Sequence, residues 1–378
     1  MSTPSQRRTS GATSSTPPGS ITDDEIEDEY EDIEDIFAHI RATDEARARA
    51  GDVRGLWTTA NNTISHLSSH FVTEPHVDFS GGWILQLQNL WHLYFVGGKY
   101  CPSEEMLAPL VLQLVETSER GLLARNQIRS DGTVEVEHAP VVVRLGDHVI
   151  QQYLWQDLPF FVPDMTSYWT QDCARMSHSQ RVSISLFWGS LVAASSAPWS
   201  YGLCRIALIV LRDTLETQRR LVRAVVEPGG ENSENSDRTI DMLTMADLLP
   251  AVNAWLTRAS GRIAQLCEAG DSGVAAGLAL PVPDEVSQLG PLAQAAGVRP
   301  VTGGFSTQRW FYWLRRLEEI GAESTPPQPS MAMASPFVQR ARERKEVARR
   351  VAQNMVYAAS QSNSTIVQEL IRMGRLPL

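Results

Sequence analysis

The stretch Leu203–Leu211, which reads LCRIALIVL, decides the fold of this chain of 378 residues. Every side chain in it is apolar except that of Arg205. A helix that is apolar on nearly all sides must be surrounded by other elements of the same domain. The stretch therefore predicts the central helix of a buried core.

Apolar residues recur at helical spacing on both sides of this stretch, from Ile36 to Ile320. Ser103 and Ser306 are predicted N-caps, and the segment Thr244–Asp247 reads as a capping box. Residues 127–162 are less regular and favour a short hairpin at most. The pattern predicts an all-α fold, a single large helical domain over residues 36–322 built as an irregular bundle of about eight to ten helices.

The acidity of the chain is concentrated at its N-terminus. Residues 1–35 hold ten Asp or Glu against two Arg, which leaves the rest of the chain with a formal charge of only −3 out of −11. Residues 1–35 are therefore expected to be a disordered, acidic tail. Because the folded part is close to neutral, its charge gives no sign of nucleic-acid or membrane binding.

The segment 21–36 carries apolar residues among its acids. Ile26, Tyr30 and Ile33 fall at i, i+4 and i+7, the spacing of one face of a helix. Three interpretations stay open: a solvated tail, a helix packed on its own domain, or an amphipathic helix that forms on a protein partner.

The chain beyond residue 226 contains two expected interruptions and a last helix. Residues 227–238 read as a flexible polar loop, and residues 323–336 as a Pro-rich linker. Residues 337–378 are expected to form a detached C-terminal helical segment. One part of its long helix is crowded with basic residues, namely Arg340, Arg342, Arg344, Lys345, Arg349 and Arg350. Because acids dilute this part, a solvated helix is favoured over a nucleic-acid arm, with folding against the acidic tail as an alternative.

The cysteines and the longest uncharged stretch bear on the compartment. Four cysteines lie far apart, which argues against a disulfide framework or a zinc ribbon and favours buried free thiols. Residues 182–204 are uncharged but contain six serines and a proline, so they predict two buried helical pieces rather than a membrane span. We expect a soluble intracellular protein, cytoplasmic or nuclear, without membrane contact.

Signatures of common chemistries are missing from the sequence. There is no Gly-x-Gly-x-x-Gly, no Walker-type lysine loop and no Gly-x-Ser-x-Gly. His66 and His70 are spaced i, i+4, but exposed histidines at a helix end explain them better than a metal site. No catalytic, cofactor-binding or metal site is predicted.

Two acids, Asp213 and Glu216, follow the central helix closely. Buried acids usually pair with a base, and Arg205 and Arg212 on the same helix are the expected counter-charges.

The ten tryptophans are the most unusual feature of the folded part. One hypothesis is a ligand pocket for a flat apolar molecule, lined by Trp155, Trp310 and Trp313, with Arg309 or Asp213 as its polar group. The alternative, which we favour, is that these rings fill the core between helices and donate their indole N–H groups to neighbouring oxygens.

Four strings stand in order along the chain: LWQDLPFFVPDMT (154–166), LRDTLE (211–216), ADLLPAVNAWL (246–256) and GFSTQRWFYW (304–313). Together they resemble a fungal family of helical proteins catalogued only as a domain of unknown function, over roughly residues 45–322. The resemblance implies a filamentous-fungal source and an intracellular helical domain. It brings no activity, cofactor or catalytic residue.

Two functions from different classes follow from these observations. The first is a non-enzymatic intracellular interaction or scaffold protein that contacts partners through its tails. The alternative is a small-molecule-binding or accessory protein of a fungal biosynthetic pathway with a Trp-lined pocket. An undescribed enzyme would need a cleft with converging titratable groups, which the sequence does not indicate.

Overall fold

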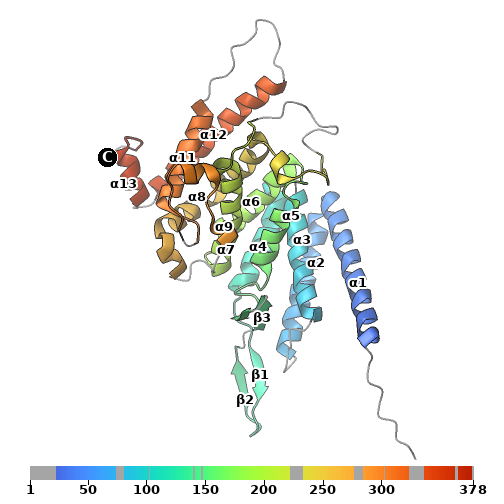
Figure 1. The fold of residues 1–378 in the computed structure, drawn as a ribbon. Coiled ribbons are helices and arrows are strands. Elements are labelled where there is room, and N and C mark those ends of the chain that lie inside the picture. The colour runs from blue at the N-terminus through green and yellow to red at the C-terminus, as the bar shows by residue number, and fades with distance from the viewer. Residues whose placement is uncertain are drawn as a thin grey trace, which may run out of the picture.

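A computed structural model of the chain describes residues 23–73, 81–101, 103–138, 141–145, 148–221, 233–275, 284–301, 303–322, 336–361 and 365–376. It confirms the all-α class (Figure 1). The helices are α1 (Asp23–Arg49), α2 (Val53–Thr73), α3 (Gly81–Tyr100), α4 (Glu104–Glu119), α5 (Phe161–Asp172), α6 (His178–Ala194), α7 (Pro198–Leu211), α8 (Met245–Ala275), α9 (Asp284–Ser287), α10 (Pro291–Ala295), α11 (Thr307–Ala322), α12 (Pro336–Ser360) and α13 (Thr365–Arg372).

Helix α7 is the centre of the core, as its sequence predicts. All side chains from Leu203 to Leu211 are buried except the partly buried Arg205. The helix packs against α5, α6 and α8, and it begins with Pro198 in its first turn, where a proline loses no helical hydrogen bond. Its last turn continues into a π-helical turn, η1, over Arg212–Glu216.

The long helices α6 and α8 pack on α7 and on each other, and α3 lies between α1 and α6. The Gly97–Gly98 pair does not end α3 but lies inside it. A Cβ at Gly97 would lie 2.8 Å from Leu110 of α4, and one at Gly98 would lie 2.6 Å from Phe187 of α6. These glycines therefore allow close helix packing rather than a helix stop.

Two antiparallel hairpins interrupt the helices. Strand β1 (Arg125–Ile128) pairs with β2 (Val134–Glu137), and β3 (Val141–Leu145) pairs with β4 (His148–Gln152). The sequence predicts one short hairpin here at most, so the second hairpin is an addition. Figure 1 shows β1 and β2 projecting away from the helical body.

Helix α1 begins at Asp23, inside the segment 1–35 that we expected to be tail. Acidic side chains near a helix N-terminus interact favourably with the helix dipole, which gives the acid-rich start of α1 a physical reason to be helical. The helix packs along α3 and α2. Residues 1–22 lie outside the described part of the chain, and so do the side chains of residues 23–34.

The expectation of a detached C-terminal helix is wrong, because α12 packs against α8 and α11. Its buried stripe consists mostly of small side chains: Ala341, Ala348, Val351, Ala352, Met355 and Ala359. Small side chains let two helices approach closely, and Arg344 and Lys345 of the same helix are buried as well. The linker residues 323–335 lie outside the described part. Within the described residues, no helix combines the length and the apolar character needed to cross a membrane.

Candidate functional site

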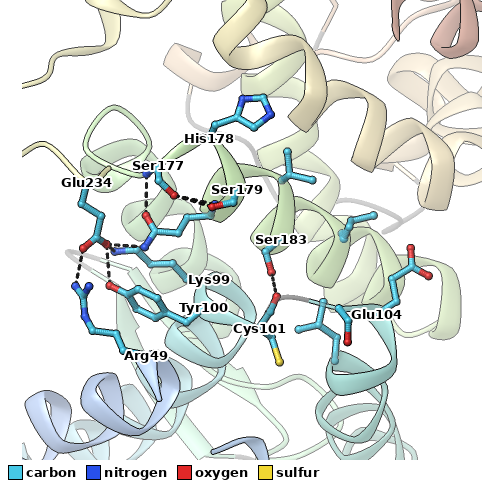
Figure 2. A pocket seen from close by; sticks show the side chains of 15 residues that line it. Arg49, Lys99, Tyr100, Cys101, Glu104, Ser177, His178, Ser179, Ser183 and Glu234 are labelled. Carbon is cyan, nitrogen blue, oxygen red and sulfur yellow. Dashed lines mark hydrogen bonds and ion pairs between the residues drawn. The ribbon is translucent and has the colours of Figure 1, made fainter. Parts of the chain in front are cut away.

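A pocket of about 700 Å³ lies where the C-terminal end of α3 meets the N-terminal ends of α4 and α6 (Figure 2). This volume is in the range of sites for small molecules. Its lining residues come from α1, α3, α4, α6 and the segment before η2 (Ile240–Met242). They are Arg49, Lys99, Tyr100, Cys101, Ser103, Glu104, Leu107, Ser177, His178, Ser179, Gln180, Val182, Ser183, Leu186 and Glu234.

Two helix caps shape the pocket. At the start of α6, the Ser177 hydroxyl accepts a hydrogen bond from the Gln180 backbone N–H at 3.2 Å, and the Gln180 side chain accepts one from the Ser177 N–H at 2.8 Å. At the start of α4, the predicted N-cap Ser103 accepts the Met106 N–H. These bonds fix where both helices begin, and with them the positions of the lining side chains.

Glu234 organises the polar side of the pocket, as Figure 2 shows. Its Oε1 accepts hydrogen bonds from the Tyr100 hydroxyl and the Gln180 amide, both at 2.8 Å, and lies 3.1 Å from Lys99 Nζ. Its Oε2 lies 2.7 Å from Arg49 Nη2. Burial opposes ionisation, but the hydrogen bonds from these four side chains outweigh it and lower the pKa of Glu234 to about 2.

Glu234 belongs to the predicted polar loop 227–238, and the end of that loop is anchored. Residues 233–238 are described, whereas residues 222–232 are not. The Asn235 N–H donates to the Arg175 carbonyl at 3.0 Å, and the buried Arg238 donates to the Met176 carbonyl at 3.0 Å. This part of the segment therefore holds a pocket residue in place.

Tyr100 lies between two carboxylates and two cations. Its hydroxyl oxygen is 2.7 Å from Glu45 and 2.8 Å from Glu234, and Arg49 bridges both acids at 2.8 and 2.7 Å. The Arg49 guanidinium and the Lys99 ammonium lie 4.5 and 5.1 Å from the centre of its ring. Burial and the two acids raise the pKa of Tyr100. The two negative and two positive charges of this cluster compensate one another, so neither acid is poised as a general base.

Two nucleophile candidates, Cys101 and Ser183, also line the pocket. Burial raises the pKa of the Cys101 thiol to about 11, which keeps it from acting as a nucleophile near neutral pH. The Ser183 hydroxyl lies 2.7 and 2.5 Å from the carbonyl oxygens of Gly98 and Cys101. Figure 2 shows the His178 ring pointing away from Ser183 and Cys101. Neither Cys101 nor Ser183 is therefore placed as a nucleophile paired with His178.

Among the described residues, no group of three or more His, Cys, Asp or Glu is arranged to hold a metal ion. His66 and His70 pack edge to face at 6.0 Å, and His70 packs against Trp83 at 4.8 Å.

The five residues of the predicted aromatic pocket are not brought together as a group. Trp155 lies between β4 and α5, and its indole donates to Ser68 of α2 at 2.8 Å. Trp310, Trp313 and Arg309 are fully buried on α11. Asp213 lies in η1 and is only partly buried. None of the five lines the pocket between α3, α4 and α6, and a ligand site among them stays a prediction.

Seven of the ten tryptophans are among the largest fully buried side chains: Trp91, Trp155, Trp169, Trp188, Trp255, Trp310 and Trp313. Trp188 packs against Trp169 and Trp255, with ring centres 5.9 and 6.4 Å apart. The Trp91 indole donates to the Pro159 carbonyl at 2.7 Å. These rings pack between helices, and several satisfy their N–H groups on neighbouring oxygens.

Arg309 and Trp313 instead meet Glu216, at the end of η1, in a fully buried ion pair. Glu216 Oε1 accepts Arg309 Nε at 2.5 Å and the Trp313 indole N–H at 2.7 Å. Its Oε2 accepts Arg309 Nη2 at 2.9 Å and the Gly290 backbone N–H at 2.7 Å. A Cβ on Gly290 would lie 2.5 Å from that of Glu216, so only glycine allows this approach.

The guanidinium of Arg309 is as fully used as the carboxylate. Its Nη1 donates to the carbonyls of Gly304 and Ser287 at 2.7 and 3.2 Å, and its Nη2 donates to that of Gln288 at 3.1 Å. With the two bonds to Glu216, all five N–H donors have acceptors. The expected counter-charge Arg212 does pair with Asp213 at 3.3 Å, but that of Glu216 comes from Arg309. The strings LRDTLE and GFSTQRWFYW thus meet in a saturated structural ion pair.

Reasoning from the sequence missed the pocket between α3, α4 and α6. One signal was present, because Ser177 and Gln180 form a Ser-x-x-Gln capping box, but such a box marks a helix start and not a ligand site.

The sequence is similar to a known protein family and to a fungal protein. The family model "Protein of unknown function (DUF3632)" matches residues 91–317. The chain is 30% identical over 243 residues to the "Oxopyrrolidines biosynthesis cluster protein G" of Penicillium oxalicum. That alignment covers 64% of this chain and 60% of the relative, so the chain spans less than two thirds of the relative's length. No solved structure matches the chain significantly.

Proposed function

The chain belongs to the DUF3632 family of proteins of unknown function, and we propose that it is an accessory protein of a fungal biosynthetic pathway. In this proposal it binds a small polar metabolite in the pocket between α3, α4 and α6 and does not transform it. One observation carries the proposal: the pocket has the volume of a ligand site, while its acid Glu234 is already paired with Arg49 and Lys99. The relative from a fungal biosynthesis cluster supports the pathway context.

The lining suggests the chemical class of the ligand. Serine hydroxyls and Gln180 supply neutral hydrogen-bonding groups, and Leu107, Val182 and Leu186 supply an apolar wall. Because the charges of Glu45 and Glu234 are balanced by those of Arg49 and Lys99, an ionic ligand would find no unpaired charge among these four residues. A neutral molecule with amide or hydroxyl groups fits best. The oxopyrrolidines in the relative's name are cyclic amides and belong to this class.

Equilibrium dialysis with mass spectrometry tests this proposal. The full chain is dialysed against a small-molecule extract of a Penicillium oxalicum culture, and the retained compounds are identified by mass. We expect at least one compound to be retained and recovered with its mass unchanged. The variant Ser179→Trp fills the pocket from an exposed position and should lose this compound.

The matched control is Ser65→Trp, an exposed serine on α2 away from the pocket, which should retain the compound as the unchanged chain does. Equal retention by both variants, or no retention at all, contradicts the location or the existence of the site. A change in the mass of the recovered compound would show catalysis and contradict an accessory role.

A second function, as an intracellular interaction or scaffold protein, is supported by the exposed part of α1. Ile36 and Ile40 are 59% and 38% exposed on a helix that starts with a block of acids. Exposed apolar residues at helical spacing are typical of protein contacts. We place the protein in the cytoplasm or nucleus of a filamentous fungus, where its four buried cysteines stay free thiols.

A further inference from the structure

An apolar groove and a polar hollow lie next to one another along α12. The apolar groove has about 590 Å³ and is lined by Glu318, Gly321, Ala322, Arg349, Ala352, Gln353, Val356, Tyr357, Ser360 and Leu376. The polar hollow has about 530 Å³ and is lined by Arg342, Lys345, Glu346, Arg349, Arg350 and Gln353. The two are neighbours, because Arg349 and Gln353 line both, and we call them together the α12 groove.

The α12 groove is apolar at one end and basic at the other. The side chain of Tyr357 is 68% exposed at the apolar end. At the other end Arg342, Arg349 and Arg350 are exposed and Lys345 is buried, and Glu346 lies 3.4 Å from Arg350. Glu318 on the groove wall is paired with Arg375 at 2.7 Å. Such a surface is complementary to a helix with an apolar stripe and acidic flanks.

The N-terminal half of α1 has that pattern. Residues 23–35 contain ten Asp or Glu, and Ile26, Tyr30 and Ile33 recur at helical spacing in the sequence. In the described part of the same helix, Ile36 and Ile40 are exposed. The chain therefore carries both an acidic amphipathic helix and a groove of complementary charge.

These two surfaces cannot meet within one molecule. The C-terminal half of α1 is held on α3, where Arg41 donates to Asn89 at 2.7 Å and the Tyr100 hydroxyl oxygen lies 2.7 Å from Glu45. Helix α12 packs on α8 and α11, on the opposite side of the molecule (Figure 1). Their complementarity can be used only between two copies.

We propose that the acidic end of α1 in one copy docks in the α12 groove of a second copy. The contact is heterologous, because a different surface is used on each partner, so repeated contacts give a ring or an open chain. The Ile residues of α1 would cover the apolar end of the groove, and its acids would face Arg342 and Arg350. Because charge drives much of the encounter, the association should weaken as salt rises.

Sedimentation velocity on the full chain tests the proposal. At low salt we expect the average mass to rise with protein concentration. At about 1 M salt, where the Debye length is about 3 Å, we expect the mass to return to that of the monomer. If the mass in low salt stays that of the monomer at every concentration, the chain does not self-associate and the proposal is overturned.

Two double variants identify the surfaces. Arg342→Glu with Arg350→Glu reverses charge in the groove, and Ile36→Asp with Ile40→Asp places charges in the described part of the apolar stripe of α1. These positions are exposed, and circular dichroism verifies that each variant folds. Each variant alone should associate more than about tenfold more weakly than the unchanged chain.

Mixing the two double variants gives the sharpest result. One still has an intact α1 and the other an intact groove, so the mixture should form dimers and nothing larger. Arg120→Glu, which reverses an exposed charge at the end of α4, is the matched control and should associate normally. A mixture that stays monomeric, or a control as weak as the groove variant, overturns the proposal.

Discussion

Replacing Glu216 by glutamine keeps the shape of the buried side chain and removes its charge. The carboxylate accepts four hydrogen bonds, two on each oxygen, from Arg309, Trp313 and Gly290. Glutamine has one oxygen and one amide nitrogen, so either rotamer turns two of these four donors toward another donor.

The size of the effect follows from this count. Each lost hydrogen bond that leaves a buried donor without an acceptor costs about 1–3 kcal/mol. The guanidinium of Arg309, which is fully buried, also loses its counter-charge. Breaking a buried ion pair from one side costs about 3–5 kcal/mol, and we expect Glu216→Gln to lower the free energy of unfolding by that amount.

Urea unfolding followed by circular dichroism measures this loss. The matched control is Glu319→Gln on the same helix as Arg309. Glu319 is half exposed and lies 3.7 Å from Arg315 and 3.1 Å from Arg316, so the loss of these surface ion pairs should cost under about 1 kcal/mol. If Glu216→Gln costs less than about 1 kcal/mol, the saturated ion pair does not stabilise the fold as we argue.

A double-mutant cycle distinguishes the loss of the Glu216–Arg309 interaction from a packing defect in one variant. Arg309→Met alone leaves the carboxylate without its cation, and the combination with Glu216→Gln should cost less than the sum of the single changes. Strict additivity would contradict direct coupling between the two residues.

The remaining predictions concern backbone strain and pH. Gly304→Ala should lower the free energy of unfolding by about 1–3 kcal/mol, because Gly304 has φ +80° and a Cβ there would lie 2.5 Å from Leu208 Cδ2. The control Gly132→Ala has a similar φ of +81° but open space around it, so it should lower the free energy of unfolding by less in the same urea titration. The pKa of Glu234 is lowered from 4.5 to about 2, so its contribution to stability is complete above about pH 4.5 and lost as pH falls toward 2; Glu234→Gln should flatten this part of the stability profile. Burial raises the pKa of Asp164 from 3.8 to about 7, so the folded state loses stability as pH rises between these values; Asp164→Asn should raise the thermal midpoint at pH 8 and leave it unchanged near pH 3.

Local signals in the sequence predicted much of the fold. The composition of Leu203–Leu211 correctly predicted that this helix is buried, because a helix that is apolar on all sides is stable only when other elements surround it. The capping box of α8 is present, with the Thr244 N–H and hydroxyl both donating to Asp247 Oδ2 at 2.7 and 2.8 Å. The predicted cap Ser306 accepts the Arg309 N–H at 3.1 Å. These contacts span three residues, so they can be read without knowing the fold.

Contacts between distant segments could not be read in this way. The partner of Glu216 is 93 residues away, and a local search considers only arginines on the same helix. The attachment of α12 was missed because its charges are conspicuous and its buried stripe is mostly alanine. The sequence did not predict the pocket, because its lining residues come from separate elements of the chain. The serines at the helix starts were interpretable as N-caps alone.

The measurement that tests the central claim most directly is hydrogen–deuterium exchange on the full chain, with and without the compound retained in dialysis. We predict slower exchange at residues 98–107 and 177–186, which surround the pocket, and no change in the projecting hairpin of β1 and β2. Protection confined to other segments, or none with the compound bound, would contradict the assignment of this pocket as the binding site.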